Sequence, residues 1–401
     1  MTTAAADPGL AREVDDILAR GADGQRLSEQ EAVLLLELAP FMALGRAADA
    51  VRRRRYPEGF ATFLIDRNIN YTNVCVTSCK FCAFYRPPRH EEGWTHDFDE
   101  IDRRVDEAAT LGATQIMFQG GHNPTLGISW YEELFSHTKA RHPEMALHSL
   151  GSSEIMHISS VSAIDVAEVI ARLRDAGLDS LAGAGAEMLV ERVRGIIAPL
   201  KESGQTWLDV METAHGLGVE STATMMMGTV ETLAERVEHM RMVRDLQDRT
   251  GGFRAFIHWS YQAEHNTLKG QSPSSFDYLR ALAVARLFLD NVAHIQSSWL
   301  TTGKEVGQLG LHFGADDMGS VMLEENVVSS AGAKHRSNTA EIVELIRAAD
   351  RVPAQRNTRY ELLRTFEDRP WDGPVALTKG MARPDDAVSA ADRSLPVVQV
   401  R

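Results

Sequence analysis

The chain has 401 residues, of which 44% are hydrophobic and 24% charged, a balance typical of globular proteins. Its formal net charge of −14 argues against a nucleic-acid partner, because phosphate binding requires concentrated positive charge. No segment approaches the roughly 20 apolar residues that a membrane span needs, and the first residues lack the basic and apolar stretches of a secretory signal. We therefore expect no nucleic-acid or membrane partner and a cytoplasmic location.

The chain begins with a predicted helical preface and continues as alternating strands and helices. Ser28 precedes an apolar run and is followed three residues later by Glu31, a capping-box pattern that predicts a helix start within residues 10–55. From Gly59 onward, short apolar or β-branched runs alternate with longer segments of helical period, which indicates βα units around a parallel sheet. The predicted strands are residues 61–65, 115–119, 145–150, 180–183, 221–227, 255–259, 294–298 and 311–313, and the clearest predicted helices are 101–111, 161–176, 233–246 and 276–289.

Eight strands with intervening helices predict an α/β fold, a near-complete TIM-type (β/α) barrel. The predicted organisation is an N-terminal helical extension (1–55), a barrel domain (56–375) and a C-terminal tail (376–401). In such barrels the reacting groups lie on the loops that follow the strands, at the carboxyl end of the sheet. The loops after the predicted strands are therefore where we look for a site.

The loop after the first predicted strand holds all the cysteines of the chain, Cys75, Cys79 and Cys82, in C-x3-C-x2-C spacing. So few cysteines exclude a disulfide scaffold and favour a reducing compartment. A structural zinc site needs four ligands, for which His90 or His96 would have to serve, and an electron-transfer cluster also uses four thiolates. Three buried structural cysteines are the remaining alternative. Three clustered thiols favour instead an iron–sulfur cluster with one iron open to another ligand.

This cysteine loop, with the aromatic Phe81 before the last cysteine, resembles the signature of the radical S-adenosylmethionine (SAM) superfamily. The resemblance implies that Cys75, Cys79 and Cys82 hold a [4Fe–4S] cluster whose open iron is chelated by SAM. An electron from the cluster then breaks the S–C5′ bond of SAM and generates a 5′-deoxyadenosyl radical. The cofactor supplies this chemistry, whereas the protein supplies binding and orientation.

Three later segments fit the same superfamily and name further candidates for SAM binding. Gly120 and Gly121 resemble the two-glycine turn that approaches the SAM amino group, although His122 stands where an acidic residue is usual. Ser152 and Glu154, after the third predicted strand, are expected to face the SAM carboxylate or ribose. Residues 224–231 resemble the adenine-side motif G-x-I-x-G-x-x-E, with Gly228 as its second glycine and Thr224 in place of the first.

Longer segments are similar to the family of cyclic dehypoxanthinyl futalosine synthases of menaquinone biosynthesis. The close relatives are aminofutalosine synthases and the radical enzymes that assemble the deazaflavin chromophore. The resemblance implies that the radical removes hydrogen from C4′ of dehypoxanthine futalosine, and that the new carbon radical attacks the substrate's benzoate ring. It also implies a reducing electron donor such as a flavodoxin or ferredoxin. The segments that carry this similarity are 73–88, 119–124, 183–189, 223–232, 250–262 and 314–332.

The cyclised ring must lose a proton and an electron to regain aromaticity, so a general base is expected. Histidine titrates closest to neutral pH, and the candidates are His258, His294 and His122, although a strand histidine is more often a core residue. The benzoate needs a cation, for which arginine offers two-pronged geometry. The candidates are Arg86, Arg89, Arg254 and Lys201, and the aromatic residues that could pack on the ring are Tyr85, Trp259 and Tyr261. A non-catalytic iron–sulfur or zinc protein remains the alternative from another class.

Overall fold

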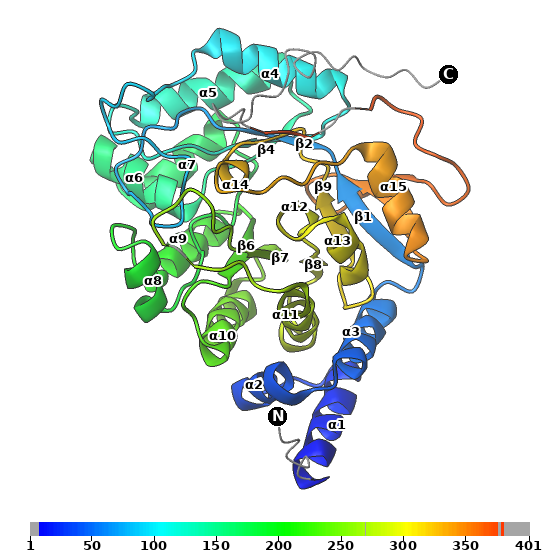
Figure 1. Ribbon diagram of the computed structural model, residues 1–401. Coiled ribbons are helices and arrows are strands. Elements are labelled where there is room, and N and C mark those ends of the chain that lie inside the picture. Colours follow the sequence, from blue (N-terminus) through cyan, green and yellow to red (C-terminus); the bar gives the residue numbers. More distant parts are fainter. Residues whose placement is uncertain (1–7, 269, 376–377, 381–401) are drawn as a thin grey trace.

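The computed structural model describes residues 8–268, 270–375 and 378–380, and a curled eleven-stranded sheet surrounded by helices forms its centre (Figure 1). The strand order is β12-β11-β1-β9-β8-β7-β6-β5-β4-β3-β2, and β10 pairs with β13 in a second, two-stranded sheet. The strands are β1 (Phe60–Leu64), β2 (Asp66–Ile69), β3 (Gln115–Phe118), β4 (Ala146–Ser149), β5 (Ser180–Leu181), β6 (Ser221–Met227), β7 (Phe253–Ser260), β8 (His294–Gln296), β9 (Asp317–Ser320), β10 (Glu324–Glu325), β11 (Val352–Arg356), β12 (Leu362–Thr365) and β13 (Lys379–Gly380).

The extended run that contains β1 and β2 closes the sheet into a barrel. β1 pairs in parallel with β9, where Thr62 lies opposite Asp317, and β2 pairs in parallel with β3, where Asp66 lies opposite Gln115. Only Ile65 separates β1 from β2, so both ends of the series β3 to β9 bond to one continuous segment. Because all these strands are parallel, their carboxyl ends open at the same end of the barrel, which confirms the predicted α/β barrel.

Helices cover the outside of the barrel (Figure 1). Their buried apolar residues belong to one hydrophobic core with apolar residues of the strands. In α10, for example, Val237, Met240 and Val243 are buried at helical spacing. Within the described residues no helix is long and apolar enough to cross a membrane. The helices are α1 (Pro8–Ala22), α2 (Glu29–Leu38), α3 (Phe41–Arg55), α4 (Phe98–Thr110), α5 (Ile128–Arg141), α6 (Ser152–Ser162), α7 (Val166–Ala176), α8 (Glu191–Ile197), α9 (Gly204–Gly216), α10 (Leu233–Thr250), α11 (Ser275–Phe288), α12 (Trp299–Thr302), α13 (Lys304–Gly310), α14 (Val327–Ser330) and α15 (Thr339–Ala348).

The N-terminal helices α1 to α3 form the predicted helical preface, and they pack against α10 and α11. Ser28 accepts a hydrogen bond from the Glu31 backbone, and the Glu31 carboxylate accepts one from the Ser28 backbone, which confirms the capping box. The predicted division into extension, barrel and tail stays a prediction. Most of that tail (376, 377 and 381–401) lies outside the described residues.

Seven of the eight predicted strands coincide with strands of the barrel, and the predicted strand at 311–313 is wrong. These residues follow α13, and Phe313 packs its ring 4.7 Å from that of Phe41 in the N-terminal helices. The barrel strand in this region is β9, whose sequence Asp-Met-Gly-Ser lacks the β-branched residues that mark strands. The predicted helix 161–176 is also divided, because Ala163 adopts a left-handed conformation (φ 54°) that ends α6.

Residues from β11 and its following loop close the amino end of the barrel. Arg356, the last residue of β11, binds the Asp317 carboxylate through Nε (2.5 Å) and Nη2 (3.0 Å). The ring of Tyr360 lies 3.8 Å beneath this guanidinium and stacks 3.6 Å from the ring of His294. Asp317 and His294 begin β9 and β8, so this cluster forms the floor of the barrel.

The floor yields a test of stability. Asp317→Asn would leave the buried Arg356 cation without its counter-ion, and we expect the free energy of unfolding to fall by about 3 kcal/mol. Asp372→Asn breaks the Arg364–Asp372 pair, in which Asp372 is 57% exposed, and should change stability by less than about 1 kcal/mol. Chemical denaturation of both variants measures the difference. Equal losses would show that the Arg356–Asp317 pair does not stabilise the barrel.

Candidate functional site

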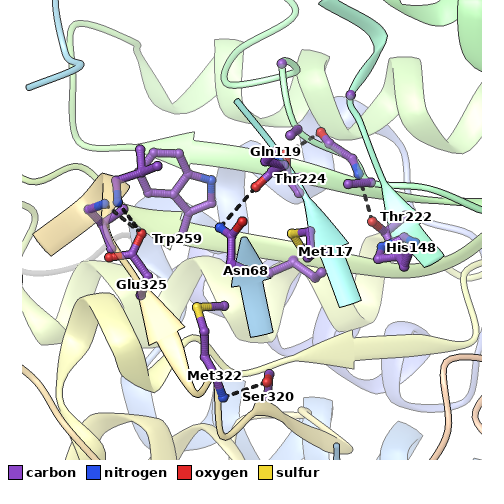
Figure 2. Close-up of a pocket in the computed structure, with 18 of the residues that line it drawn as sticks. Asn68, Met117, Gln119, His148, Thr222, Thr224, Trp259, Ser320, Met322 and Glu325 are labelled. Atoms are coloured by element: carbon purple, nitrogen blue, oxygen red, sulfur yellow. Dashed lines mark hydrogen bonds between the residues drawn. The ribbon is translucent and has the colours of Figure 1, made fainter. Parts of the chain in front are cut away.

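A cavity of about 390 Å³ occupies the barrel interior and extends from the cysteine loop to the floor. Its lining includes the three cysteines at the carboxyl end of the barrel and Arg356 and Tyr360 at the amino end. Figure 2 shows Trp259 and Glu325 at one side of this cavity, His148 and Thr222 at the other, and Asn68 with Met117 between them. The strands therefore contribute polar and apolar side chains along one continuous space.

The cysteine loop follows β2 and folds back on itself, so that its thiols line the cavity together. Cys75 donates its backbone N–H to the Arg86 carbonyl (2.8 Å). Backbone N–H groups also face the sulfurs: that of Thr77 lies 3.4 Å from Cys75 Sγ, and those of Phe84 and Tyr85 bond to Cys82. Donors of this kind stabilise thiolate ligands of iron–sulfur clusters.

Burial affects the protonation of two of the three thiols, those of Cys79 and Cys82. Burial raises the pKa of Cys79 to about 12 and raises that of Cys82 as well, so iron would have to displace their protons. No three His, Cys, Asp or Glu side chains in the described part of the chain surround a single ion position. The three cysteines line one cavity, as a cluster that uses a different iron for each thiolate requires, and they fit a [4Fe–4S] group.

The glycine turn after β3 packs directly under the cysteine loop. A Cβ on Gly121 would lie 2.2 Å from the Val74 carbonyl oxygen, and one on Gly120 would lie 2.6 Å from the Tyr71 ring. His122 follows this turn and lines the cavity. Its Nδ1 lies 2.8 Å from the Thr77 hydroxyl. Close packing against the cysteine loop thus explains why both residues of this turn are glycine.

The Glu154 carboxylate joins three loops at the carboxyl end of the barrel. It accepts hydrogen bonds from the Tyr71 hydroxyl (2.7 Å), the Gly120 backbone (3.0 Å) and the Gly151 backbone (2.8 Å). Burial raises the pKa of Glu154, and these donors oppose the rise. Glu154 lines the cavity but is already fixed by the protein, so its arrangement indicates a positioning role, and its contact with SAM stays a prediction.

The remaining predicted SAM residues divide into two groups. Phe81 lines the cavity near Lys201, whose ammonium lies 5.9 Å from the ring centre. Ser152 is fully buried and lies outside the cavity lining, which contains its neighbour Ser153 instead. Gly228 also lies outside the lining. Its φ of 92° forms the turn after β6, where its N–H donates to Glu231 (2.6 Å).

Two of the three predicted catalytic histidines lie away from the cavity lining. His258 points out of the barrel, where its ring stacks on that of Tyr278 (4.4 Å) and its Nε2 donates to the Tyr278 carbonyl (3.2 Å). Its neighbour Trp259 points inward, because successive strand residues face opposite sides. His294 belongs to the floor, where Nδ1 bonds Asp316 (2.6 Å). These positions argue against a catalytic role for either residue and leave His122.

Asn68 and Thr222 are polar residues of the cavity that were not identified from the sequence. Asn68 donates to Gln119 (3.3 Å), and Thr222 and Thr224 bond the backbone of Gly183 (2.9 and 2.7 Å; Figure 2). Polar residues at every second position of a buried strand are the signal that indicates an interior lined for a ligand. In β6 the pair Thr222 and Thr224 carries this signal.

The four cations considered for the substrate's carboxylate lie in different environments. Arg86 pairs with Glu92, which is 59% exposed, and Arg89 is exposed. Lys201 and Arg254 line the cavity. Burial lowers the pKa of Lys201, but Glu187 at 2.8 Å more than reverses this effect, so the pKa is raised.

The part of the cavity near the floor also contains a carboxyl group that should make stability depend on pH. Burial raises the pKa of Asp66 to about 6, against hydrogen bonds from Ser320 and Gln115. An unfolded aspartate has a pKa of about 3.9, so between about pH 4 and 6 the folded state holds a proton that the unfolded state releases. The contribution of Asp66 to stability therefore falls as pH rises through this window.

We expect Asp66→Asn to remove this pH-dependent loss of stability. The unfolding free energy of the variant minus that of the parent chain should be about 2 to 3 kcal/mol larger at pH 7.5 than at pH 4. Chemical denaturation at both pH values measures the change, and Asp175→Asn, at a residue 70% exposed, is the control. A difference between Asp66→Asn and the parent that stays constant with pH would contradict the assigned shift.

Comparisons with known proteins agree with this geometry. The model of the "Radical SAM superfamily" matches residues 69–243, and that of the "CofH/MqnC C-terminal region" matches residues 250–369. Among solved structures, HydG, a maturase of the [FeFe]-hydrogenase, has a TM-score of 0.67 at 13% identity over 86% of this chain and 76% of that chain. Methylornithine synthase has a TM-score of 0.64 at 17% identity over 83% of this chain and 95% of that chain. These structures share the fold.

Curated relatives are much more similar in sequence. The cyclic dehypoxanthine futalosine synthase of Streptomyces coelicolor is 62% identical over 90% of this chain and 92% of its own length. That of Halalkalibacterium halodurans is 45% identical over 89% and 96%. The aminodeoxyfutalosine synthase of Thermus thermophilus is 37% identical over 90% and 98%. The chain belongs to the cyclic dehypoxanthine futalosine synthase family of the radical SAM superfamily.

Proposed function

We propose that this chain is a radical SAM cyclase that converts dehypoxanthine futalosine to cyclic dehypoxanthine futalosine in menaquinone biosynthesis. The observation that carries the proposal is the 62% identity with the Streptomyces coelicolor cyclase, against 37% with the aminodeoxyfutalosine synthase of Thermus thermophilus. The continuous cavity, with three cysteines at one end and Arg254 toward the other, supports it. We further propose a cytoplasmic enzyme that receives electrons from a reduced flavodoxin or ferredoxin.

In this proposal Cys75, Cys79 and Cys82 hold the [4Fe–4S] cluster. The bound and reduced cluster, together with SAM, supplies a 5′-deoxyadenosyl radical that removes the C4′ hydrogen of the substrate. Phe81, together with the glycine turn below the cysteine loop, would form the wall against which SAM lies, because these residues line the same cavity as the cysteines.

The chain's own residues orient the substrate and exclude water. Trp259 and Met322 line the cavity and offer apolar surface to the benzoate ring, which reduces side reactions of radicals with solvent. The cyclised ring must release a proton, and His122 is the predicted histidine that lines the cavity. Burial and the nearby Lys201 lower the pKa of His122 to about 3, so its ring is neutral at pH 7 but is a weaker base than one whose pKa lies near the working pH.

The central test follows SAM and substrate together. With the cluster reconstituted anaerobically, a chemical reductant, SAM and dehypoxanthine futalosine should give 5′-deoxyadenosine and a product lighter by two hydrogens, both followed by mass spectrometry. Cys79→Ala should abolish both products, whereas Lys80→Ala, at the exposed position next to it, should retain them. Formation of 5′-deoxyadenosine without loss of substrate would refute the cyclase assignment but not the radical SAM chemistry.

A second test concerns the glycine turn. Gly121→Ala would place a Cβ against the Val74 carbonyl and displace the cysteine loop, so we expect iron and sulfide content after reconstitution to fall by at least about half. Gly195→Ala places its Cβ in open space and should retain full content. A full cluster in Gly121→Ala would show that the loop tolerates this contact.

A further inference from the structure

Arg254 is the cation of the cavity whose charge is not balanced at close range. It is the second residue of β7, its side chain is 10% exposed, and it lines the cavity. Its nearest carboxylate is that of Glu220, 3.7 Å away on a side chain that is 53% exposed. An ion pair with so exposed a partner contributes little. Lys201 and Arg356, by contrast, lie 2.8 Å and 2.5 Å from buried carboxylates.

The guanidinium of Arg254 also has unused donors. Among the described residues, Nη2 is its only nitrogen with hydrogen-bond partners, namely the Ser180 hydroxyl (2.7 Å) and His148 Nδ1 (3.3 Å). Nε is buried and has no hydrogen-bond partner. A buried arginine with free donors is a costly arrangement unless an acceptor is supplied from elsewhere.

His148 contributes a further donor beside Arg254. Arginine can only donate, and the Ser180 hydroxyl that accepts from Arg254 can donate in turn to His148 Nδ1 (2.7 Å). His148 Nδ1 is therefore an acceptor, and the ring proton lies on Nε2. Burial and the charges of Arg254 and Arg356 hold the pKa of His148 well below its usual value, so the ring is a neutral donor that lines the cavity with Arg254.

The acidic groups that line the cavity are committed to other partners. Glu187 pairs with Lys201 (2.8 Å), and Glu325 accepts the backbone N–H groups of Val327 and Val328 (2.8 and 2.9 Å). Asp66 accepts from Gln115 (2.8 Å), and Glu154 is held by the three loops described above. The anion that would balance the charge of Arg254 and accept its free donors must therefore come from a ligand.

We propose that Arg254, with the Nε2–H of His148 beside it, binds the benzoate carboxylate of the substrate. This subsite rests on the proposed function, which supplies a substrate with one carboxylate. Arg254 is six residues from the carboxyl end of β7, about 20 Å along the strand. The carboxylate thus binds near the floor, and the aromatic ring and ribose extend toward the cysteine loop, where the C4′ hydrogen is removed.

The test compares the substrate with its benzoate methyl ester, which removes the charge and keeps the rest of the molecule. Binding of each to the anaerobic, cluster-loaded and SAM-bound protein is measured by titration. The parent chain should bind the acid about 100-fold more tightly than the ester. Arg254→Met should lose about 100-fold in affinity for the acid and bind the ester as the parent does, and Arg254→Lys should recover part of the loss. Arg359→Met, at an exposed arginine near the floor, is the matched control and should retain the preference.

Equal affinity of the parent chain for acid and ester would overturn the subsite. This comparison needs no variant, so it tests the subsite even if Arg254→Met folds poorly. A variant that loses acid and ester binding equally would also overturn it, because that loss would be structural. Turnover is measured separately. Absence of cyclised product from the parent chain would refute the proposed function, while the ratio of acid to ester binding would still decide the subsite.

Discussion

The cysteine loop and the cavity both depend on the extended run of residues 60–69, to which both ends of the curled sheet bond. Its first half pairs with β9 and its second half with β3, and Cys75 follows only six residues after the end of β2. Closure therefore fixes where the cysteine loop leaves the barrel. It also encloses a space lined from both halves of the chain, with the cysteines in one family match and Arg254, Trp259 and Arg356 in the other.

The loops at the carboxyl end of the barrel are held in place by buried polar contacts between protein groups. Glu154 ties the cysteine loop to the loops after β3 and β4 through three hydrogen bonds, and Gly121 allows Val74 to approach. A buried carboxylate with three donors is stable only while all the donors stay in place. The loops that would hold the cluster are thus organised by the protein itself, which reduces the conformational entropy lost when the cluster and SAM bind.

The sequence predicted those features that depend on local pattern. The cysteine spacing, the glycine turn and the alternation of strands with helices are read from neighbouring residues, and they led to the barrel and to the proposed cluster ligands. Which side of a strand a residue faces depends on register, and register is set by pairing with distant strands. A bulge between Ser221 and Ala223 in the β6–β7 ladder shifts β7, so that Trp259 faces inward and His258 outward. No local pattern reveals such a shift, so the sequence did not show that His258 faces away from the cavity.

The distribution of charge along the cavity determines what kind of ligand the barrel can hold. The chain carries a net charge of −14, so its overall field does not attract an anionic substrate. Within the barrel, the cations near the cysteines and on the floor are matched by Glu187 and Asp317, which leaves Arg254 as the local source of positive potential. Because the interior has a low dielectric constant, one unbalanced cation there outweighs many screened surface charges. An anionic ligand is therefore selected by this single interior position, and its orientation along the barrel follows from where Arg254 lies on β7.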